Sequence, residues 1–336
     1  MKKLVYLVLL PLFTLFLLGL GLGAHRFFHG PPPPGAAEVL FSIPEGTGFG
    51  EVCRILRREG VVKNTNGLYL VGRVGGAERQ IRAGRYRIVS GTPAGRVLRM
   101  LQRGGNEVIR VTVPEGLRVD ETARIVAANL AFEEEAFLAA ARDPEAAEKY
   151  GIPGPTLEGY LFPETYRFFW DDPVESVLRR MTGRFRDEFD EEARARAAGL
   201  GLTPREAVTL ASIIEAEAAV GEERPRISAV FHNRLRIGMK LQADPTVQFA
   251  RGTRERLLRK HLELESPYNT YVVGGLPPGP ICSPGRASIR AALEPLPGSR
   301  DLYFVASGEG GRHIFSSSRE AHDLAKSRAS ARRESP

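Results

Sequence analysis

Cysteine, histidine and tryptophan are scarce in this chain. Its 336 residues include 2 Cys, 6 His and 1 Trp. Cys53 and Cys282 lie far apart, so they form neither a disulfide framework nor a zinc-binding pattern; we expect two free, packed thiols, although spacing alone leaves a single bridge open. The histidines form no HExxH motif or other ligand cluster. The sequence therefore predicts no metal site and no cofactor.

Acidic residues are fewer than basic ones, and the formal net charge is +7. Such an excess is compatible with nucleic acid, anionic lipid or an acidic polymer as a partner. Basic and acidic residues are mixed along almost the whole chain, and no nucleic-acid-binding motif is present. We interpret the charge as that of an ordinary solvated surface and expect no nucleic-acid partner.

Charged residues are absent from one long segment near the amino terminus. The apolar run 4–24 follows Lys2 and Lys3, and as a helix it would be about 31 Å long, enough to cross a bilayer core of about 30 Å. A cleaved signal peptide is the alternative, but its apolar region would be shorter, and residues 21–24 form a poor cleavage site. We therefore predict a single-pass anchor in the cell (inner) membrane, with the amino terminus in the cytoplasm and the remainder outside.

Changes in composition divide the chain into several parts and predict the α+β class. We expect a cytoplasmic tail (1–3), a transmembrane anchor (4–24), a proline-rich spacer (25–37), a small LysM-like α/β module (38–105), a linking subdomain (106–150), a mixed α+β catalytic domain (151–325) and a frayed tail (326–336).

An internal repeat supports the division at residue 106. The segment 41–46, which ends in Pro-Glu-Gly, recurs as 111–116, and a stretch with helical periodicity follows each copy. The first copy continues through a second helical stretch into a strand at 84–89. This strand–helix–helix–strand order resembles a LysM-type glycan-binding module, while a small α/β unit with a spacing role is the alternative.

The segment 157–166 is rich in aromatic residues and contains Glu158 and Glu164. Aromatic faces and carboxylates suit the rings and hydroxyl groups of sugars. A packed strand with a polar edge explains the segment equally well.

A helix from Ala207 to Ala218 contains the strongest candidates for chemistry. Thr203, Pro204 and Glu206 before it have the pattern of a helix start with a capping box. Apolar residues surround almost the whole helix, which predicts that it is buried.

Two carboxylates, Glu215 and Glu217, interrupt this apolar helix. They point about 160° apart, so they cannot face one substrate atom unless the helix bends. Glu217 continues the stripe of bulky apolar residues, where loss of hydration would raise its pKa and keep it protonated, as a general acid requires. Pairing of Glu217 with a buried arginine, Arg234 or Arg236, is the alternative at this point, and Glu215 is the weaker candidate for the acid.

Further polar groups follow the next predicted helix, 223–237. Gln242, Asp244 and Thr246 alternate along a run that we expect to be extended, so that all three share one face. Irregular loops that contain Asn269 and Tyr271 come next, and strands are expected at 302–306 and 313–316. Such loops often line sites, but they are equally common as surface turns.

Six motifs in order resemble those of the endolytic murein transglycosylase family. They are Leu210–Glu217, Asn233–Met239, Leu241–Val247, Tyr268–Tyr271, Gly275–Gly279 and Leu302–Ala306. The resemblance covers nearly the whole chain. It implies an enzyme, a lytic transglycosylase, that faces the outside of the cell, cuts within nascent peptidoglycan strands and works near peptidoglycan synthases.

The resemblance also assigns a role to Glu217, because the second glutamate of the family's E-x-E pair is the essential carboxylate. Glu217 would protonate the glycosidic oxygen between N-acetylmuramic acid and N-acetylglucosamine, and would then take the proton of the muramic C6 hydroxyl as that oxygen attacks C1. The product would be a 1,6-anhydro end, formed without water or metal.

Helper residues and other functions stay open at this stage. Candidates for substrate binding or support are Glu215, Glu158, Glu164, Gln242, Asp244, Asn269 and Tyr271. Most glycosidases use two carboxylates about 5–10 Å apart, so Glu158, Glu164 or Asp244 is a possible second group. The alternatives to a transglycosylase are a hydrolytic muramidase and a non-enzymatic wall-binding scaffold that recruits synthases.

Overall fold

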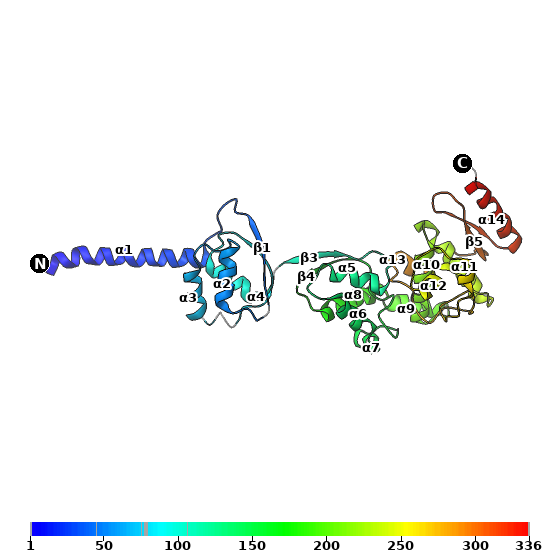
Figure 1. Ribbon diagram of the computed structural model, residues 1–336, viewed down its shortest axis with the longest axis horizontal. Helices are drawn as coiled ribbons and strands as arrows, with labels where there is room; N and C mark the ends of the chain where they lie inside the picture. Colours follow the sequence, from blue (N-terminus) through cyan, green and yellow to red (C-terminus); the bar gives the residue numbers. More distant parts are fainter. Residues whose placement is uncertain (1, 45, 75, 77–79, 106, 335–336) are drawn as a thin grey trace. The chain divides into compact units, whose positions relative to one another are not determined.

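The computed structural model describes the backbone of residues 2–44, 46–74, 76, 80–105 and 107–334. It also describes their side chains, except those of residues 2–11, 24, 27 and 330–334. The fold is mixed α+β and mostly helical, and the described strands form small two-stranded sheets (Figure 1). Two compact units divide the chain: the first consists of residues 1–109 and 167–172, and the second of residues 110–166 and 173–336.

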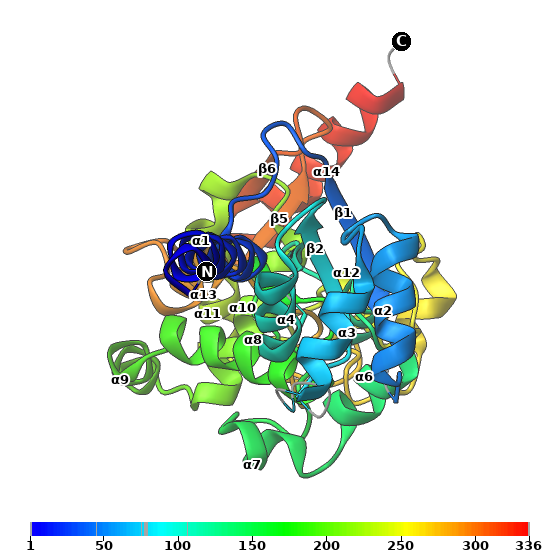
Figure 2. The same ribbon diagram turned by 90° about the vertical axis from the view of Figure 1, so that its left-hand side faces the viewer.

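The first unit begins with a long helix and continues into a small α/β module. Its elements are α1 (Lys2–His29), β1 (Glu38–Ile43), α2 (Phe49–Arg58), α3 (Thr65–Val74), β2 (Gly84–Val89) and α4 (Ala94–Arg103). Strands β1 and β2 pair antiparallel, from Glu38 opposite Val89 to Ile43 opposite Gly84. Helices α2, α3 and α4 cover one face of this pair (Figures 1 and 2). The predicted strand–helix–helix–strand order is therefore present.

Apolar side chains from every element of the module form one core. Val52 and Leu56 of α2, Leu68 of α3 and Val97 of α4 have no exposed surface, and they pack with Tyr86 of β2. The stretch with helical periodicity after the first copy of the repeat is α2, and its apolar side chains, among them Val52, Ile55 and Leu56, are buried. Because the core is continuous, the module has the hydrophobic interior that an independent folding unit needs.

Helix α1 covers the segment predicted as the membrane anchor. Within the described part of the chain, no helix combines the length and apolar character that a membrane span needs. The predicted anchor, 4–24, includes residues 4–11 and 24, whose side chains lie outside the described set.

The segment predicted as a spacer, 25–37, is partly the end of α1. Beyond it, a Cβ atom on Gly91 would lie 2.9 Å from Pro33, so this part of the proline run packs on the module.

The second copy of the sequence repeat also consists of a strand followed by a helix. Strand β3 (Val108–Thr112) precedes α5 (Val119–Ala127), as β1 precedes α2. Glu45 of the first Pro-Glu-Gly lies outside the described residues. Strand β3 pairs with β4 (Thr165–Phe169). The chain passes from one unit to the other within each of these two strands.

The second unit is a helical domain with one β-hairpin. After β3 come α5, α6 (Glu134–Arg142), α7 (Ala146–Tyr150), α8 (Val174–Glu188), α9 (Glu191–Gly199), α10 (Pro204–Glu217), α11 (Arg224–Arg236), α12 (Asp244–Ala250) and α13 (Arg286–Leu293). Two 3-10 turns lie at Gly221–Glu223 and Arg259–Glu263, and β5 (Tyr303–Ala306), β6 (His313–Ser316) and α14 (Arg319–Glu334) end the described chain.

Helix α10 lies at the centre of this unit. All residues from Ala207 to Ile214 are buried, and α9, α11, α12 and α13 pack against it. Burial on all sides agrees with the apolar character of its sequence. The tail that we expected to fray, 326–336, is helical as far as Glu334, because α14 packs on β5 and β6 and buries Ala325 and Ala329.

Candidate active site

The sequence around the start of α10 fixes where this helix begins. The Thr203 hydroxyl accepts a hydrogen bond from the Glu206 amide at 3.2 Å, and the Glu206 carboxylate accepts one from the Thr203 amide at 2.8 Å. The predicted capping box is therefore formed, and Pro204 occupies the first turn. The helix ends at Glu217, since the next residue leaves the helical conformation. The partial negative charge at a helix carboxyl end disfavours a second negative charge on Glu217.

The surroundings of Glu217 favour its protonated form. Its side chain is only partly exposed. Burial raises the pKa of Glu217 to about 8, the charge of Asp244 acts in the same direction, and Arg234 acts in the opposite one. Among the described residues, no group donates a hydrogen bond to its carboxyl oxygens. At neutral pH, Glu217 is thus mostly a neutral acid whose proton is available.

Asp244 and Tyr271 form a hydrogen-bonded pair, and both residues interact electrostatically with Glu217. The Tyr271 hydroxyl donates to Asp244 Oδ1 at 2.6 Å. Burial raises the pKa of Tyr271, and the hydrogen bond to Asp244 and the charges of Asp244 and Glu217 raise it further, so Tyr271 remains a donor. Asp244 therefore remains an acceptor next to the acid.

A tight turn places Asp244 at the start of α12. Gln242 has a φ of 49°, the single positive φ of a non-glycine residue in the described chain, and its amide donates to Thr270 O at 3.1 Å. The Ala243 amide donates to the Thr270 hydroxyl at 3.0 Å. The expectation of an extended run through Gln242, Asp244 and Thr246 is therefore wrong. Pro245 and the hydrogen bonds to Thr270 begin a helix there, and Gln242 is an exposed residue of the turn.

Asn269 shapes the loop that contains Tyr271. Its side-chain amide donates to Leu262 O at 3.0 Å and Leu264 O at 2.8 Å, and its oxygen accepts from the Tyr271 amide at 3.0 Å. All of these bonds are to the protein's own backbone, and Asn269 is fully buried. The structure thus places Asn269 as a support for Tyr271.

Arg234 lies near Glu217 without an ion pair to it. Its guanidinium donates to Leu302 O at 2.6 Å and to Leu241 O, and it lies over the Tyr303 ring. Burial lowers the pKa of Arg234, while Tyr303, Tyr271 and Glu217 oppose this change. In the described chain neither Arg234 nor Arg236 pairs with Glu217, so the arrangement gives no support to the alternative of a buried ion pair.

Glu215, two residues before Glu217, has different neighbours. It accepts a hydrogen bond from Arg224 at 3.1 Å and from the Gly285 amide at 2.9 Å, and 7% of its side chain is exposed. Gly285 is the N-cap residue of α13. The carboxylate of Glu215 therefore caps α13 and pairs with α11, and both of its oxygens are occupied.

The other two candidate carboxylates belong to different parts of the unit. Glu158 is partly buried, accepts from the Val119 amide at 3.2 Å, and has a pKa raised to about 7, chiefly by loss of hydration. Glu164 lies at the surface, where Arg184 donates to it at 2.6 Å. The structure thus brings Asp244 and Tyr271 together near Glu217, while Glu158, Glu164 and Glu215 have other neighbours.

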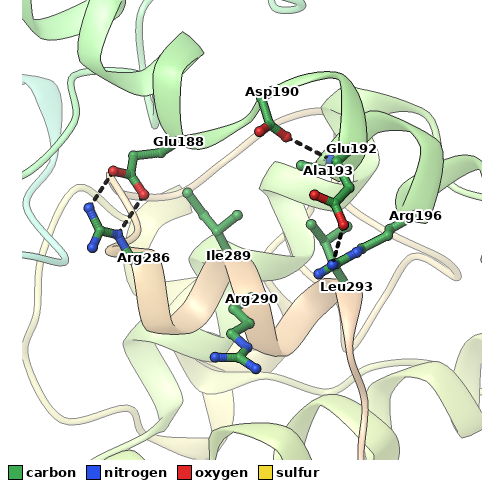
Figure 3. A pocket seen from close by; sticks show the side chains of 9 residues that line it. All are labelled: Glu188, Asp190, Glu192, Ala193, Arg196, Arg286, Ile289, Arg290 and Leu293. Carbon is green, nitrogen blue, oxygen red and sulfur yellow. Dashed lines mark hydrogen bonds and ion pairs between the residues drawn. The ribbon is translucent and has the colours of Figure 1, made fainter.

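A separate pocket of about 200 Å³ lies beside α13 and contains paired charges (Figure 3). Arg286 binds both oxygens of Glu188, and Arg196 pairs with Glu192 at 2.6 Å. The Asp190 carboxylate caps α9 through the Ala193 amide at 3.0 Å. Since its charges already have partners, we interpret this pocket as a set of ion pairs that joins α8, α9 and α13.

Two residues of the site were not singled out as functional by the sequence. Tyr303 contacts Arg234 through its ring face, and Thr270 holds the turn before Asp244. Both lie in motifs that carried the family resemblance. Their roles depend on contacts between segments far apart in the chain, which periodicity does not reveal. Within the described residues, no group of three or more His, Cys, Asp or Glu side chains is placed to hold a metal ion.

The arrangement places a protonated carboxylic acid next to a carboxylate and a tyrosine, a set that suits proton transfer. Comparison with known proteins agrees: the chain belongs to the YceG-like family, whose model matches residues 41–328.

Named relatives cover most of the chain. An endolytic murein transglycosylase of Bacillus subtilis (strain 168) is 31% identical over an alignment of 310 residues, and the match covers 86% of this chain and 84% of that protein. One of Streptococcus pneumoniae serotype 2 is 30% identical, and the match covers 85% of this chain but 57% of the longer relative. The crystal structure of a yceG-like protein of Listeria monocytogenes superposes with a TM-score of 0.60 at 30% identity, covering 86% of this chain and 99% of the other.

Proposed function

We propose that this protein is an endolytic lytic transglycosylase that cleaves peptidoglycan strands between N-acetylmuramic acid and N-acetylglucosamine. The observation that carries the proposal is the pKa of Glu217, which is raised to about 8 in a carboxyl group without a hydrogen-bond donor in the described chain. The names of the relatives support the choice of substrate.

Glu217 acts twice in the proposed reaction. It first donates its proton to the glycosidic oxygen, and the bond from that oxygen to the muramic C1 breaks. The Glu217 carboxylate then accepts the proton of the C6 hydroxyl, whose oxygen forms the new bond to C1. The acid is regenerated, no water is consumed, and the product has a 1,6-anhydro end. One carboxylate is sufficient, which agrees with the separate surroundings of Glu215.

Asp244 supplies negative charge during this reaction. Glycosidic cleavage passes through a transition state with positive charge at C1 and the ring oxygen, and a nearby carboxylate stabilises that charge. Tyr271 holds Asp244 by the hydrogen bond of 2.6 Å. Asn269 in turn holds the backbone of Tyr271.

The proposal extends to the place where the enzyme works. Apolar side chains of α1 between Leu12 and Leu22 are largely exposed, with fractions from 47% to 65% for the large ones, as expected of a helix that contacts lipid. We place the second unit outside the cytoplasm, beside peptidoglycan synthases, where cleavage of nascent strands would set glycan length. The first unit would hold the glycan through its LysM-like module.

The deciding experiment is product analysis. Purified full-length protein is incubated with uncrosslinked glycan strands, and the new ends are identified by mass spectrometry. Anhydro ends have the mass of the cleaved strand without added water, and we expect them to dominate. Reducing ends would indicate a hydrolytic muramidase, and strand binding without cleavage would indicate a scaffold; either result would refute the proposal.

A further inference from the structure

Glu217 is the last residue of α10, so the chain after it also determines where its carboxyl group lies. Ala218 has an extended backbone, and the 3-10 turn Gly221–Glu223 follows before α11 begins. Helical hydrogen bonds hold Glu217 from its amino-terminal side, while the last carbonyl groups of a helix have no partner within it. The position of Glu217 therefore depends on how the linker, residues 218–223, is held.

The turn of the β5–β6 hairpin packs on this linker. A Cβ atom on Gly311 would lie 3.2 Å from the Cβ of Ala219 and 3.8 Å from a methyl group of Val220. Gly311 has a φ of 71°, a backbone conformation that favours glycine. The hairpin turn thus lies directly against the second and third residues after Glu217, although it is about 90 residues away in the sequence.

A nearly buried pair, Glu223 and His313, joins the end of the linker to the start of β6. The His313 amide donates to the two Glu223 oxygens at 3.1 and 3.2 Å, and its ring Nδ1 lies 2.7 Å from Glu223 Oε2. Only 10% of the His313 side chain and 11% of the Glu223 side chain are exposed. Hydrogen bonds to a carboxylate are stronger when they are shielded from water. The pair therefore fixes the linker at Glu223.

The hairpin is itself held against α11. The His313 ring packs edge-on against Phe304 of β5, and Phe304 packs edge-on against Phe231 of α11, at 5.2 and 5.8 Å between ring centres. Arg234 of α11, whose charge acts on Glu217, donates to the backbone at the start of the hairpin. The hairpin therefore contacts both the chain that follows Glu217 and the arginine near it.

We propose that Glu223 and His313 are positioning residues for the reaction, and that they hold the linker so that the carboxyl group of Glu217 stays shielded from water near Asp244. This inference rests on the proposed function, because the group that they position is the proposed acid. Neither residue contacts the glycan in this role. A displacement of a catalytic group by about 1 Å can reduce a rate about 100-fold, so a contact six residues away can affect turnover.

Two substitutions at Glu223 test the pair in the full-length protein. Glu223→Ala removes all three contacts to His313, whereas Glu223→Gln removes the charge but keeps an oxygen that can accept from the His313 amide. Glu222→Gln is the matched control, because it removes the same charge from the preceding residue, which is 79% exposed and pairs with Arg312 at 3.2 Å. Thermal unfolding in parallel identifies a variant that has lost its fold, and Glu223→Gln decides if Glu223→Ala does not fold.

Hydrogen exchange measured by mass spectrometry reports how firmly the linker is held, and it needs no cleavage. We expect the amides of residues 218–223 to exchange about tenfold faster in Glu223→Ala and less than twofold faster in Glu222→Gln.

The titration of Glu217 is followed by carbon-13 NMR of protein with labelled glutamate carboxyl groups, and the signal is identified by its absence in Glu217→Gln. Because loss of hydration keeps the pKa of Glu217 high, this pKa should fall toward the ordinary range of a glutamic acid in Glu223→Ala. It should fall less in Glu223→Gln and stay unchanged in Glu222→Gln.

Turnover of glycan strands is the third measurement. We expect kcat to fall about tenfold in Glu223→Ala and about threefold in Glu223→Gln, with KM within about twofold of the wild type, because the pair acts on the acid and not on binding. An unchanged titration of Glu217 in folded Glu223→Ala protein would overturn the proposal, even if the linker exchanged faster. Equal effects in Glu222→Gln would also overturn it, since charge alone would then be the cause. A wild type that does not cleave would refute the proposed function, while exchange and titration would still decide whether the pair positions Glu217.

Discussion

Glu215 and Glu217 lie two residues apart on α10, but the protein surrounds them differently. Glu215 has an arginine and a backbone amide as partners, whereas Glu217 has no hydrogen-bond donor among the described residues and lies within the field of another carboxylate. A buried carboxylate that is fully paired contributes to structure. A half-buried carboxylate without partners holds a proton that it can transfer, and this difference separates the two residues by role.

The largest effect should follow removal of the acid at Glu217. Glu217→Gln keeps the shape of the side chain but has no proton to donate, so we expect turnover of glycan strands to fall by about 10³-fold or more. The measurement is release of anhydro ends per hour by mass spectrometry.

The same substitution should not destabilise the fold. The folded-state pKa of Glu217 is raised, so its contribution to stability is complete below about pH 4.5 and is lost as the pH rises through about 8. Glu217→Gln should therefore unfold at a higher temperature than the wild type at pH 9, and the difference should shrink at pH 5. Activity close to that of the wild type would refute the assignment of the acid.

The opposite outcome is expected for Glu215. Glu215→Gln leaves Arg224 without its carboxylate and weakens the cap of α13, so we expect a loss of about 1–3 kcal/mol in the free energy of unfolding. Folded protein should retain most of its turnover. Urea unfolding at 25 °C measures the first quantity and product release below the transition measures the second. If Glu215→Gln abolishes turnover while the fold remains intact, the comparison between the two residues fails.

The sequence predicted this contrast in part. Helical phase placed Glu217 among bulky apolar neighbours and Glu215 on another face, and the capping box at Thr203 fixed the start of the helix. Periodicity could not show that α10 ends at Glu217 or that Arg224 and Gly285 bind Glu215. Those contacts join segments up to 70 residues apart.

The region of Asp244 shows more clearly what local sequence patterns cannot predict. Alternating polar residues predicted an extended run at 242–246, but the chain instead forms a turn and a helix. The reason is the hydrogen bonds of the Gln242 and Ala243 backbones to Thr270, which compensate for the positive φ of Gln242. The sequence contains both segments but not their pairing. The family motifs supplied the site residues that local patterns could not.

A smaller effect tests the electrostatic link between Asp244 and Glu217. Glu217 must be protonated to act as the acid, so kcat/KM should fall above about pH 8. Asp244→Asn removes a charge that raises the pKa of Glu217, and the alkaline limb of the pH profile should therefore move to lower pH. We also expect roughly a tenfold loss at the optimum, because the transition state loses a nearby negative charge. An unchanged alkaline limb would show that Asp244 does not act on the acid.

The smallest effect should follow loss of the hydrogen bond to Asp244. Tyr271→Phe removes the donor at 2.6 Å but keeps the ring, and Asn269 still holds the backbone. Because Asp244 is exposed, water can replace the lost donor, and we expect a three- to tenfold decrease in kcat with little change in KM. Glu164→Gln is a matched control at the surface, where a single ion pair contributes about 0–1 kcal/mol. A Tyr271→Phe enzyme as active as this control would show that Asp244 needs no support from Tyr271, and the contrast between the two glutamates would then rest on burial alone.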